Sequence, residues 1–248
     1  MAKTETSSLS KKIILFLKIV FLLISVTLGD LLIAFIIGLL YQIIIPTMDI
    51  NEIMSQYSYQ FLLTLFVSIY HIILICILSK KTDITFEKIK PFNIFRYMLF
   101  GGMIGLTYNL LINSPSSEKV TIIVFLNMGI IGPILEEFLF RGWLYQKLQL
   151  SFCNRKAKWI STLIFAFFHS HWTNILYAFL LGGILIESYD RTKNFKIPII
   201  IHIGANMTVI LFYSIVKPYR IISIILSFLL MIFYFLYQTF NTTKKLRS

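Results

Sequence analysis

The segment from Leu135 to Tyr145 places ionisable side chains inside a stretch that is long enough to span a membrane. Glu136 and Glu137 are adjacent carboxylates, and Arg141 follows within the same apolar run. An ionisable group in the hydrocarbon core of a bilayer costs roughly 2.5 kcal/mol or more, so such groups usually face a cavity that has a function. The segment therefore indicates a functional site rather than a simple membrane anchor.

Two later apolar segments carry imidazole and amide side chains. His169 lies in the first of them, and His202 lies in the second with Asn206 one helical turn later. A carboxylate acts as a general base, and imidazole and amide groups donate hydrogen bonds to a developing oxyanion. The combination predicts hydrolytic chemistry within the membrane.

Depth along each helix predicts that these groups meet. Counted from the nearest lysine predicted to be cytoplasmic, at about 1.5 Å per residue, Glu136 and His169 both lie roughly 16 Å deep. On the same count, Asn206 lies roughly 15 Å and His202 roughly 9 Å deep. We therefore expect the four side chains to share one layer in the cytoplasmic half of the membrane.

Helical periodicity assigns different directions to the two carboxylates. Glu137 and Arg141 are four residues apart and share a helix face, so they can form an ion pair. Glu136 is rotated by about 100° from Glu137 and remains free to face a cavity. Gly132 and Pro133, just before the pair, are expected to bend or loosen the helix and admit water.

Structural explanations exist for each of these residues taken alone. The Glu137–Arg141 pair could have a purely structural role in holding helices together. His202 and Asn206 could be groups that form hydrogen bonds between helices. The remaining ionisable residues of the apolar segments are interpreted as packing or interface residues: His71, His171, Glu187 and Asp190. The joint agreement in depth is what favours catalysis.

Composition identifies a polytopic membrane protein with one domain, residues 1–248. The chain is 57% hydrophobic and 14% charged, with a mean hydropathy of +0.80. A soluble domain of this length has too little interior to bury so much apolar surface. The net charge of +12 is spread over connecting loops, which fits membrane topology and not nucleic-acid binding. Cys76 and Cys153 suggest neither a disulfide framework nor a metal motif.

The apolar runs predict an all-α bundle of about eight transmembrane helices. The runs are 13–44, 58–79, 97–113, 120–146, 159–171, 173–190, 197–216 and 221–240. With 13–44 as one long helix, most Lys and Arg residues fall in loops on one side. Basic residues collect in the cytoplasm, so both termini are predicted to be cytoplasmic. Gly101-x-x-x-Gly105 and Gly182-Gly183 are expected to serve close helix packing.

Three motifs resemble those of the CPBP family, the CAAX proteases and bacteriocin-processing enzymes also called Abi proteins. Glu-Glu-x-x-x-Arg occurs at 136–141, Phe-x-x-x-His at 165–169 and His-x-x-x-Asn at 202–206. The resemblance covers about residues 119–210, which would form the catalytic core. Three motifs in order with fitting spacing are strong evidence, whereas the first half of the chain offers only a compatible topology.

The resemblance implies an intramembrane glutamic endopeptidase that cleaves a membrane-associated protein or peptide and needs no cofactor. Its implied catalytic residues are Glu136, His169, His202 and Asn206, and its supporting residues are Glu137, Arg141 and Phe165. We expect Glu136 and His169 to activate a water molecule. His202 and Asn206 would then stabilise the oxyanion. The pathway would be bacteriocin immunity or peptide maturation.

Two alternatives remain open from the sequence. Glu136, His169 and His202 could form a two-histidine, one-carboxylate zinc site, although no His-Glu-x-x-His motif is present. The chain could also be a non-catalytic immunity protein that binds a partner in the membrane; a transporter is less favoured, because no internal repeat is visible. The Ile-, Lys- and Asn-rich composition suggests a bacterial plasma membrane, with the active site open to the cytoplasmic side.

Overall fold

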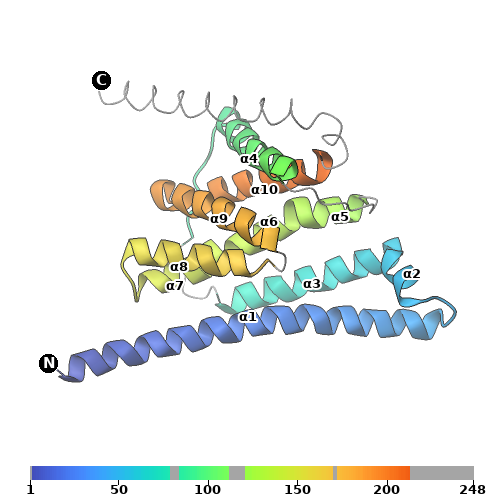
Figure 1. The fold of residues 1–248 in the computed structure, drawn as a ribbon, viewed down its shortest axis with the longest axis horizontal. Helices are drawn as coiled ribbons and strands as arrows, with labels where there is room; N and C mark the ends of the chain where they lie inside the picture. The colour runs from blue at the N-terminus through green and yellow to red at the C-terminus, as the bar shows by residue number, and fades with distance from the viewer. Residues whose placement is uncertain (1, 79–83, 112–120, 170–171, 213–248) are drawn as a thin grey trace.

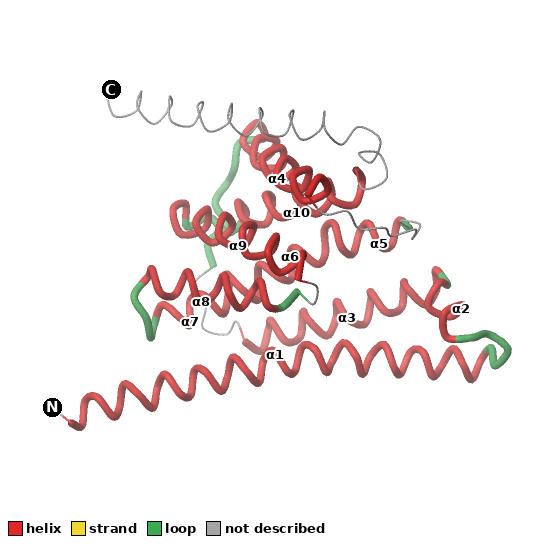
Figure 2. Tube along the Cα trace, in the orientation of Figure 1, coloured by secondary structure: helices red, strands yellow, loops and turns green. Residues whose placement is uncertain are grey.

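The computed structural model describes residues 2–78, 84–111, 121–169 and 172–212, which contain helices and no strand. Figures 1 and 2 show these helices as a layered bundle. They are α1 Ala2–Ile44, α2 Ile50–Ser55, α3 Tyr57–Leu78, α4 Pro91–Leu111, α5 Ile122–Leu126, η1 Asn127–Ile131, α6 Gly132–Glu137, η2 Phe138–Tyr145, α7 Gln146–Gln149, α8 Asn154–Phe167, α9 Trp172–Thr192 and α10 Lys196–Phe212. The predicted all-α class is confirmed for these residues, and the predicted span 221–240 lies outside them.

The first apolar run forms one uninterrupted helix, α1, as the sequence predicts. Among the described residues, two helical stretches are long and apolar enough to cross a membrane: Ile13–Ile44 and Tyr57–Ile77. These stretches lie in α1 and α3, which run side by side as an antiparallel hairpin closed by α2 (Figure 1). Large apolar side chains such as Phe21 and Ile43 are 73% and 76% exposed, as lipid-facing residues would be.

Helix α8 ends earlier than predicted. The sequence assigns 159–171 to one span, but α8 ends at Phe167 and His169 lies in the turn that follows. The 14 residues of α8 extend about 21 Å, which is less than the roughly 30 Å of a bilayer core. Helix α8 packs against α9 as a hairpin, and Lys158 of α8 lies 2.7 Å from both Glu187 and Asp190 of α9. This hairpin therefore holds His169 at its closed end.

Glycines bring α4 and α10 into backbone contact. A Cβ added at Gly101 would lie 1.9 Å from the carbonyl oxygen of Ile201, and one at Gly105 would lie 2.3 Å from that of Ala205. On the facing helix, a Cβ at Gly204 would lie 2.2 Å from the carbonyl oxygen of Met98. The packing role predicted for Gly101 and Gly105 is therefore confirmed, and the contact fixes the helix that carries His202 and Asn206.

Residues 122–149 form a continuous helical rod that contains two π-helical sections, η1 and η2. Gly132 donates its N–H to the carbonyl of Asn127, five residues earlier, which widens the turn just before Pro133. Proline has no N–H and cannot continue the regular ladder. The expected loosening of the helix at Gly132 and Pro133 thus takes the form of a π turn, a feature often found at functional sites.

Candidate active site

The predicted ion pair between Glu137 and Arg141 is present and completely buried. Nη1 of Arg141 lies 2.7 Å from Oε1 of Glu137, with side-chain exposures of 1% and 0%. Nη2 of Arg141 donates a 3.0 Å hydrogen bond to the carbonyl of Gly182 on α9. A buried charge is strongly destabilising unless it is paired and hydrogen-bonded. The pair therefore connects the rod to α9 and presents a fixed carboxylate to its other neighbours.

Phe165 packs at the centre of the site. Its ring lies 4.5 Å from the guanidinium carbon of Arg141, which makes a cation–π contact. The rings of His169 and His202 approach the same phenyl ring edge-on, with centroids 5.1 Å and 5.8 Å away. Gly182 lies so close that an added Cβ would be 2.8 Å from Cδ1 of Phe165. This phenylalanine therefore fixes the relative positions of the arginine and both imidazoles.

His202 lies between the two carboxylates of the rod. Its Nδ1 is 2.9 Å from Oε1 of Glu137, and its Nε2 is 3.7 Å from Oε2 of Glu136. The side chain of His202 is only 2% exposed, whereas that of Glu136 is 29% exposed. The bond to Glu137 orients the imidazole so that its other nitrogen faces Glu136, in the manner of a carboxylate that fixes a catalytic histidine.

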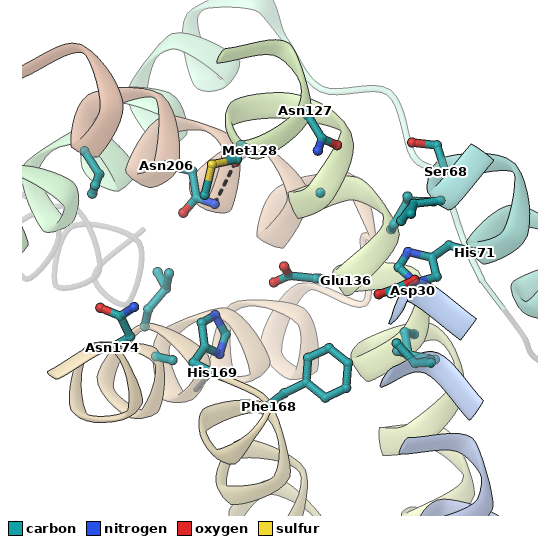
Figure 3. Close-up of a pocket in the computed structure, with 18 of the residues that line it drawn as sticks. Asp30, Ser68, His71, Asn127, Met128, Glu136, Phe168, His169, Asn174 and Asn206 are labelled. Atoms are coloured by element: carbon teal, nitrogen blue, oxygen red, sulfur yellow. Dashed lines mark hydrogen bonds and ion pairs between the residues drawn. The ribbon is translucent and has the colours of Figure 1, made fainter. Parts of the chain in front are cut away.

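His169 approaches the site from the closed end of the α8–α9 hairpin. Its Nδ1 lies 3.0 Å from the carbonyl oxygen of Phe165. A ring that donates through Nδ1 leaves Nε2 available as an acceptor. Figure 3 shows the His169 ring and the Glu136 carboxylate facing the same space.

Asn206 satisfies a carbonyl that the π turn leaves without its helical partner. Nδ2 of Asn206 donates a 3.0 Å hydrogen bond to the carbonyl of Met128 (Figure 3). In a π turn that carbonyl would accept from the residue five positions later, which is Pro133, and proline has no N–H. An amide carries two N–H groups, so the bond to Met128 leaves the second one for a ligand.

A cavity of about 410 Å³ joins these groups. Glu136, His169 and Asn206 line it directly, whereas His202 and Glu137 lie behind Glu136. The structure thus brings all seven predicted site residues together: Glu136, Glu137, Arg141, Phe165, His169, His202 and Asn206. Their roles in catalysis stay predictions.

The cavity also has polar lining residues that sequence reasoning did not assign to the site. These are Asp30, Ser68, His71, Tyr108, Asn127 and Asn174. The hydroxyl of Tyr108 donates to Oδ1 of Asn174 at 2.5 Å. The sequence predicts a packing or interface role for His71, yet His71 and Asp30 both face the same cavity as Glu136 (Figure 3). The signal in the sequence that could have identified Asp30 and His71 as site residues is the presence of an ionisable side chain within an apolar run.

The donor set that could hold a metal is Glu136, His169 and His202. Within the described part of the chain, no group of three or more His, Cys, Asp or Glu residues has an arrangement suited to a metal ion. The contact of His202 with Glu137 uses one of the two imidazole nitrogens.

The segment that holds this site matches a known family. Residues 118–208 match the family model described as "Type II CAAX prenyl endopeptidase Rce1-like". This match supports the assignment to the CPBP family that the three motifs suggest. All three motifs of the site lie inside the matched residues, and α1 to α4 lie outside them.

The chain is also similar to individual bacterial proteins. The chain is 35% identical over 111 residues to the "Membrane-embedded CAAX protease MroQ" of Staphylococcus aureus and 36% identical over 87 residues to the "Putative membrane peptidase YdiL" of Bacillus subtilis. It is 31% identical over 107 residues to the "UPF0177 protein YbdI" of Lactococcus lactis. These matches cover 40%, 34% and 42% of this chain.

The same matches cover 45%, 34% and 56% of the respective relatives, so the chain spans about half or less of each. No solved structure matches the chain.

Proposed function

We propose that this CPBP-family chain is an intramembrane endopeptidase that hydrolyses a peptide bond with a water molecule activated by Glu136 and His169. The observation that carries the proposal is the position of Glu136. Its carboxylate lines the cavity beside His169, while its neighbour Glu137 is fully buried and occupied by Arg141 and His202. The Glu137 carboxylate thus has a structural role, and the Glu136 carboxylate is available to act as a base.

In the proposed reaction, Glu136 accepts a proton from water while His169 holds that water in place. The oxygen attacks the carbonyl carbon, and the carbonyl oxygen becomes an oxyanion. Transfer of the proton from Glu136 to the amide nitrogen then allows the C–N bond to break and releases an amine and a carboxylic acid. The acid then gives its proton to the amine, so the final products are a carboxylate and an ammonium group.

The oxyanion needs hydrogen-bond donors on the far side of the cavity. The second N–H of Asn206 is one candidate donor. The other is His202, which would have to carry a proton on Nε2 in addition to the Nδ1 proton that it donates to Glu137, and which would act from its place behind Glu136. Loss of one such donor typically lowers the rate by about 10²–10³. Glu137 and Phe165 would act as positioning residues, because they contact the imidazoles and do not line the cavity. Arg141 would act through both of them, since it pairs with Glu137 and lies over the ring of Phe165.

The membrane arrangement belongs to the same proposal. Two helical stretches qualify as spans among the described residues, and we propose that the remaining apolar runs bring the number to about eight, with both termini in the cytoplasm. Bacterial relatives named as membrane proteases support a plasma-membrane location. We also propose that the site opens to the cytoplasm and that the protein acts in bacteriocin immunity or peptide maturation.

The direct test compares Glu136→Gln with wild type on purified protein in lipid nanodiscs. Peptide products are identified by mass spectrometry after incubation with a membrane-peptide library. We expect the substitution to lower cleavage at least 10³-fold, because the amide cannot act as a base. Cleavage by Glu136→Gln at the wild-type rate would refute the mechanism.

A second arm addresses metal and binding alternatives. We propose metal-independent hydrolysis, so cleavage should be unchanged after dialysis against a strong chelator, whereas a zinc enzyme would lose activity and regain it with added zinc. In cells, a non-catalytic binding protein would retain its phenotype with Ala at position 136.

A further inference from the structure

The α1–α3 hairpin places a second ionisable pair on the wall of the cavity that holds Glu136. Nε2 of His71 lies 3.0 Å from Oδ1 of Asp30, and both residues line the cavity (Figure 3). They come from the part of the chain outside the matched family segment. The pair therefore lies in the first half of the chain, outside the matched segment.

Local packing keeps this pair in register. A Cβ at Gly29 would lie 2.5 Å from the ring of Tyr70, so the absence of a side chain at Gly29 makes room for this ring beside the pair. The hydroxyl of Tyr70 donates a 2.7 Å hydrogen bond to the carbonyl of Ser25, one helical turn earlier. The neighbours of these contact residues are Asp30 and His71, which are thereby held opposite each other.

The Asp30 carboxylate has capacity for a ligand. Nε2 of His71 faces Oδ1 of Asp30 at 3.0 Å as an ion-pair contact without a hydrogen bond, and Oδ2 of Asp30 is a further acceptor. The side chain of Asp30 is 37% exposed and that of His71 is 21% exposed. Val26, Val67 and Leu74 provide apolar walls around the pair. Such a site suits a long side chain with an apolar stem and a cationic end.

The charge of the cavity lining also favours a cationic ligand. With histidines counted as neutral, the described lining carries the two carboxylates of Asp30 and Glu136 and no Lys or Arg. Charge complementarity favours a cationic partner and disfavours an acidic one in such surroundings. A lysine or arginine of the substrate would neutralise Asp30, whereas a glutamate would be repelled by both carboxylates.

We propose that Asp30, oriented by His71, is a specificity determinant that binds a lysine or arginine side chain of the peptide substrate, at one fixed position relative to the bond that is cleaved. This inference rests on the proposed peptidase function. Asp30 would contact the substrate but not the reacting atoms, and His71 would be a positioning residue. Glu136 would activate the water molecule elsewhere in the same cavity, beside His169.

The test is a cleavage-specificity profile of the full chain in nanodiscs against a peptide library that is randomised around the cleaved bond. Wild type should cleave peptides with Lys or Arg at one position roughly tenfold or more faster than those with Gln there, as expected for a hydrogen bond to a charged group. Asp30→Asn, which preserves shape, should remove this preference and leave cleavage of the Gln peptides near the wild-type rate. His71→Gln should reduce the preference, and Ser68→Ala, on the same wall, should keep it.

Each outcome decides between the two proposals. Loss of the basic preference in Asp30→Asn, with the Gln peptides still cleaved, supports the inference. Cleavage by wild type without any basic preference, or an unchanged preference in both Asp30→Asn and His71→Gln, overturns the inference and leaves the peptidase function intact. Absence of cleavage by wild type, with any peptide, overturns the peptidase function and the inference with it.

Discussion

Gly182 and Gly183 are adjacent on α9 but face different surroundings, and this difference yields a sharp prediction. A Cβ at Gly182 would lie 2.8 Å from Cδ1 of Phe165 and 3.6 Å from Nη2 of Arg141, whereas a Cβ at Gly183 would have nothing within 4 Å. We therefore expect Gly182→Ala to damage the site and Gly183→Ala to leave it unchanged. Helix propensity alone would improve both variants by the same amount.

The magnitude follows from the lack of room around Phe165. Its ring is 1% exposed and lies 5.0 Å from the ring of Phe140, in addition to its contacts with Arg141 and both imidazoles. Overpacking of this kind typically costs about 1–3 kcal/mol. Replacement of glycine by alanine in a helix returns about 1 kcal/mol. The net change for Gly182→Ala is therefore a loss of up to about 2 kcal/mol, against a gain of about 1 kcal/mol for Gly183→Ala.

Two measurements on the same nanodisc samples check this prediction. Thermal unfolding should rank the proteins Gly183→Ala, wild type and Gly182→Ala from most to least stable. Cleavage should fall at least tenfold in Gly182→Ala, because a displaced phenyl ring moves both histidines, and misplacement of catalytic groups by about 1 Å can cost 10²-fold. Equal stability and equal cleavage in the two alanine variants would refute the packing argument.

Two further predictions concern charge and helix contact. Arg141→Met should destabilise the protein by about 3–5 kcal/mol, because it leaves the buried carboxylate of Glu137 without its cation. Adding Glu137→Gln to this variant should recover part of the lost melting temperature. A double variant that is no more stable than Arg141→Met would contradict this reasoning. Gly101→Ala should separate α4 from α10, because its Cβ would lie 1.9 Å from the Ile201 carbonyl oxygen, and should lower both melting temperature and cleavage. The matched control is Gly38→Ala, where nothing lies within 4 Å, and a similar loss there would count against the interpretation.

Local spacing was sufficient to predict several parts of this protein. Four-residue separation on one helix predicts the Glu137–Arg141 pair, which is present at 2.7 Å. Apolar run lengths predict one long first helix, and the glycine spacing predicts the close α4–α10 contact, both of which the structure contains. The order and spacing of three motifs indicate the family that the comparisons support. These features depend on residues near one another in the chain, whose relative placement is set by helix geometry.

Contacts between distant segments could not be read in this way. Periodicity does not reveal that His202 contacts Glu137 rather than Glu136, because that choice depends on how α10 is rotated against the rod. The bond from Asn206 to Met128 requires both a π turn and a neighbouring helix at the right height.

The sequence by itself determined which chemical groups this protein carries and which of them share a helix face, because helix geometry repeats along the chain. Only the tertiary structure decided that the Glu137–Arg141 pair is completely buried and that His202 contacts Glu137 at 2.9 Å. It also decided that Asp30 and His71, 41 positions apart, lie 3.0 Å from each other on the cavity wall. The physical reason is that side-chain packing sets the rotation and depth of one helix against another, and a single sequence contains no direct record of either.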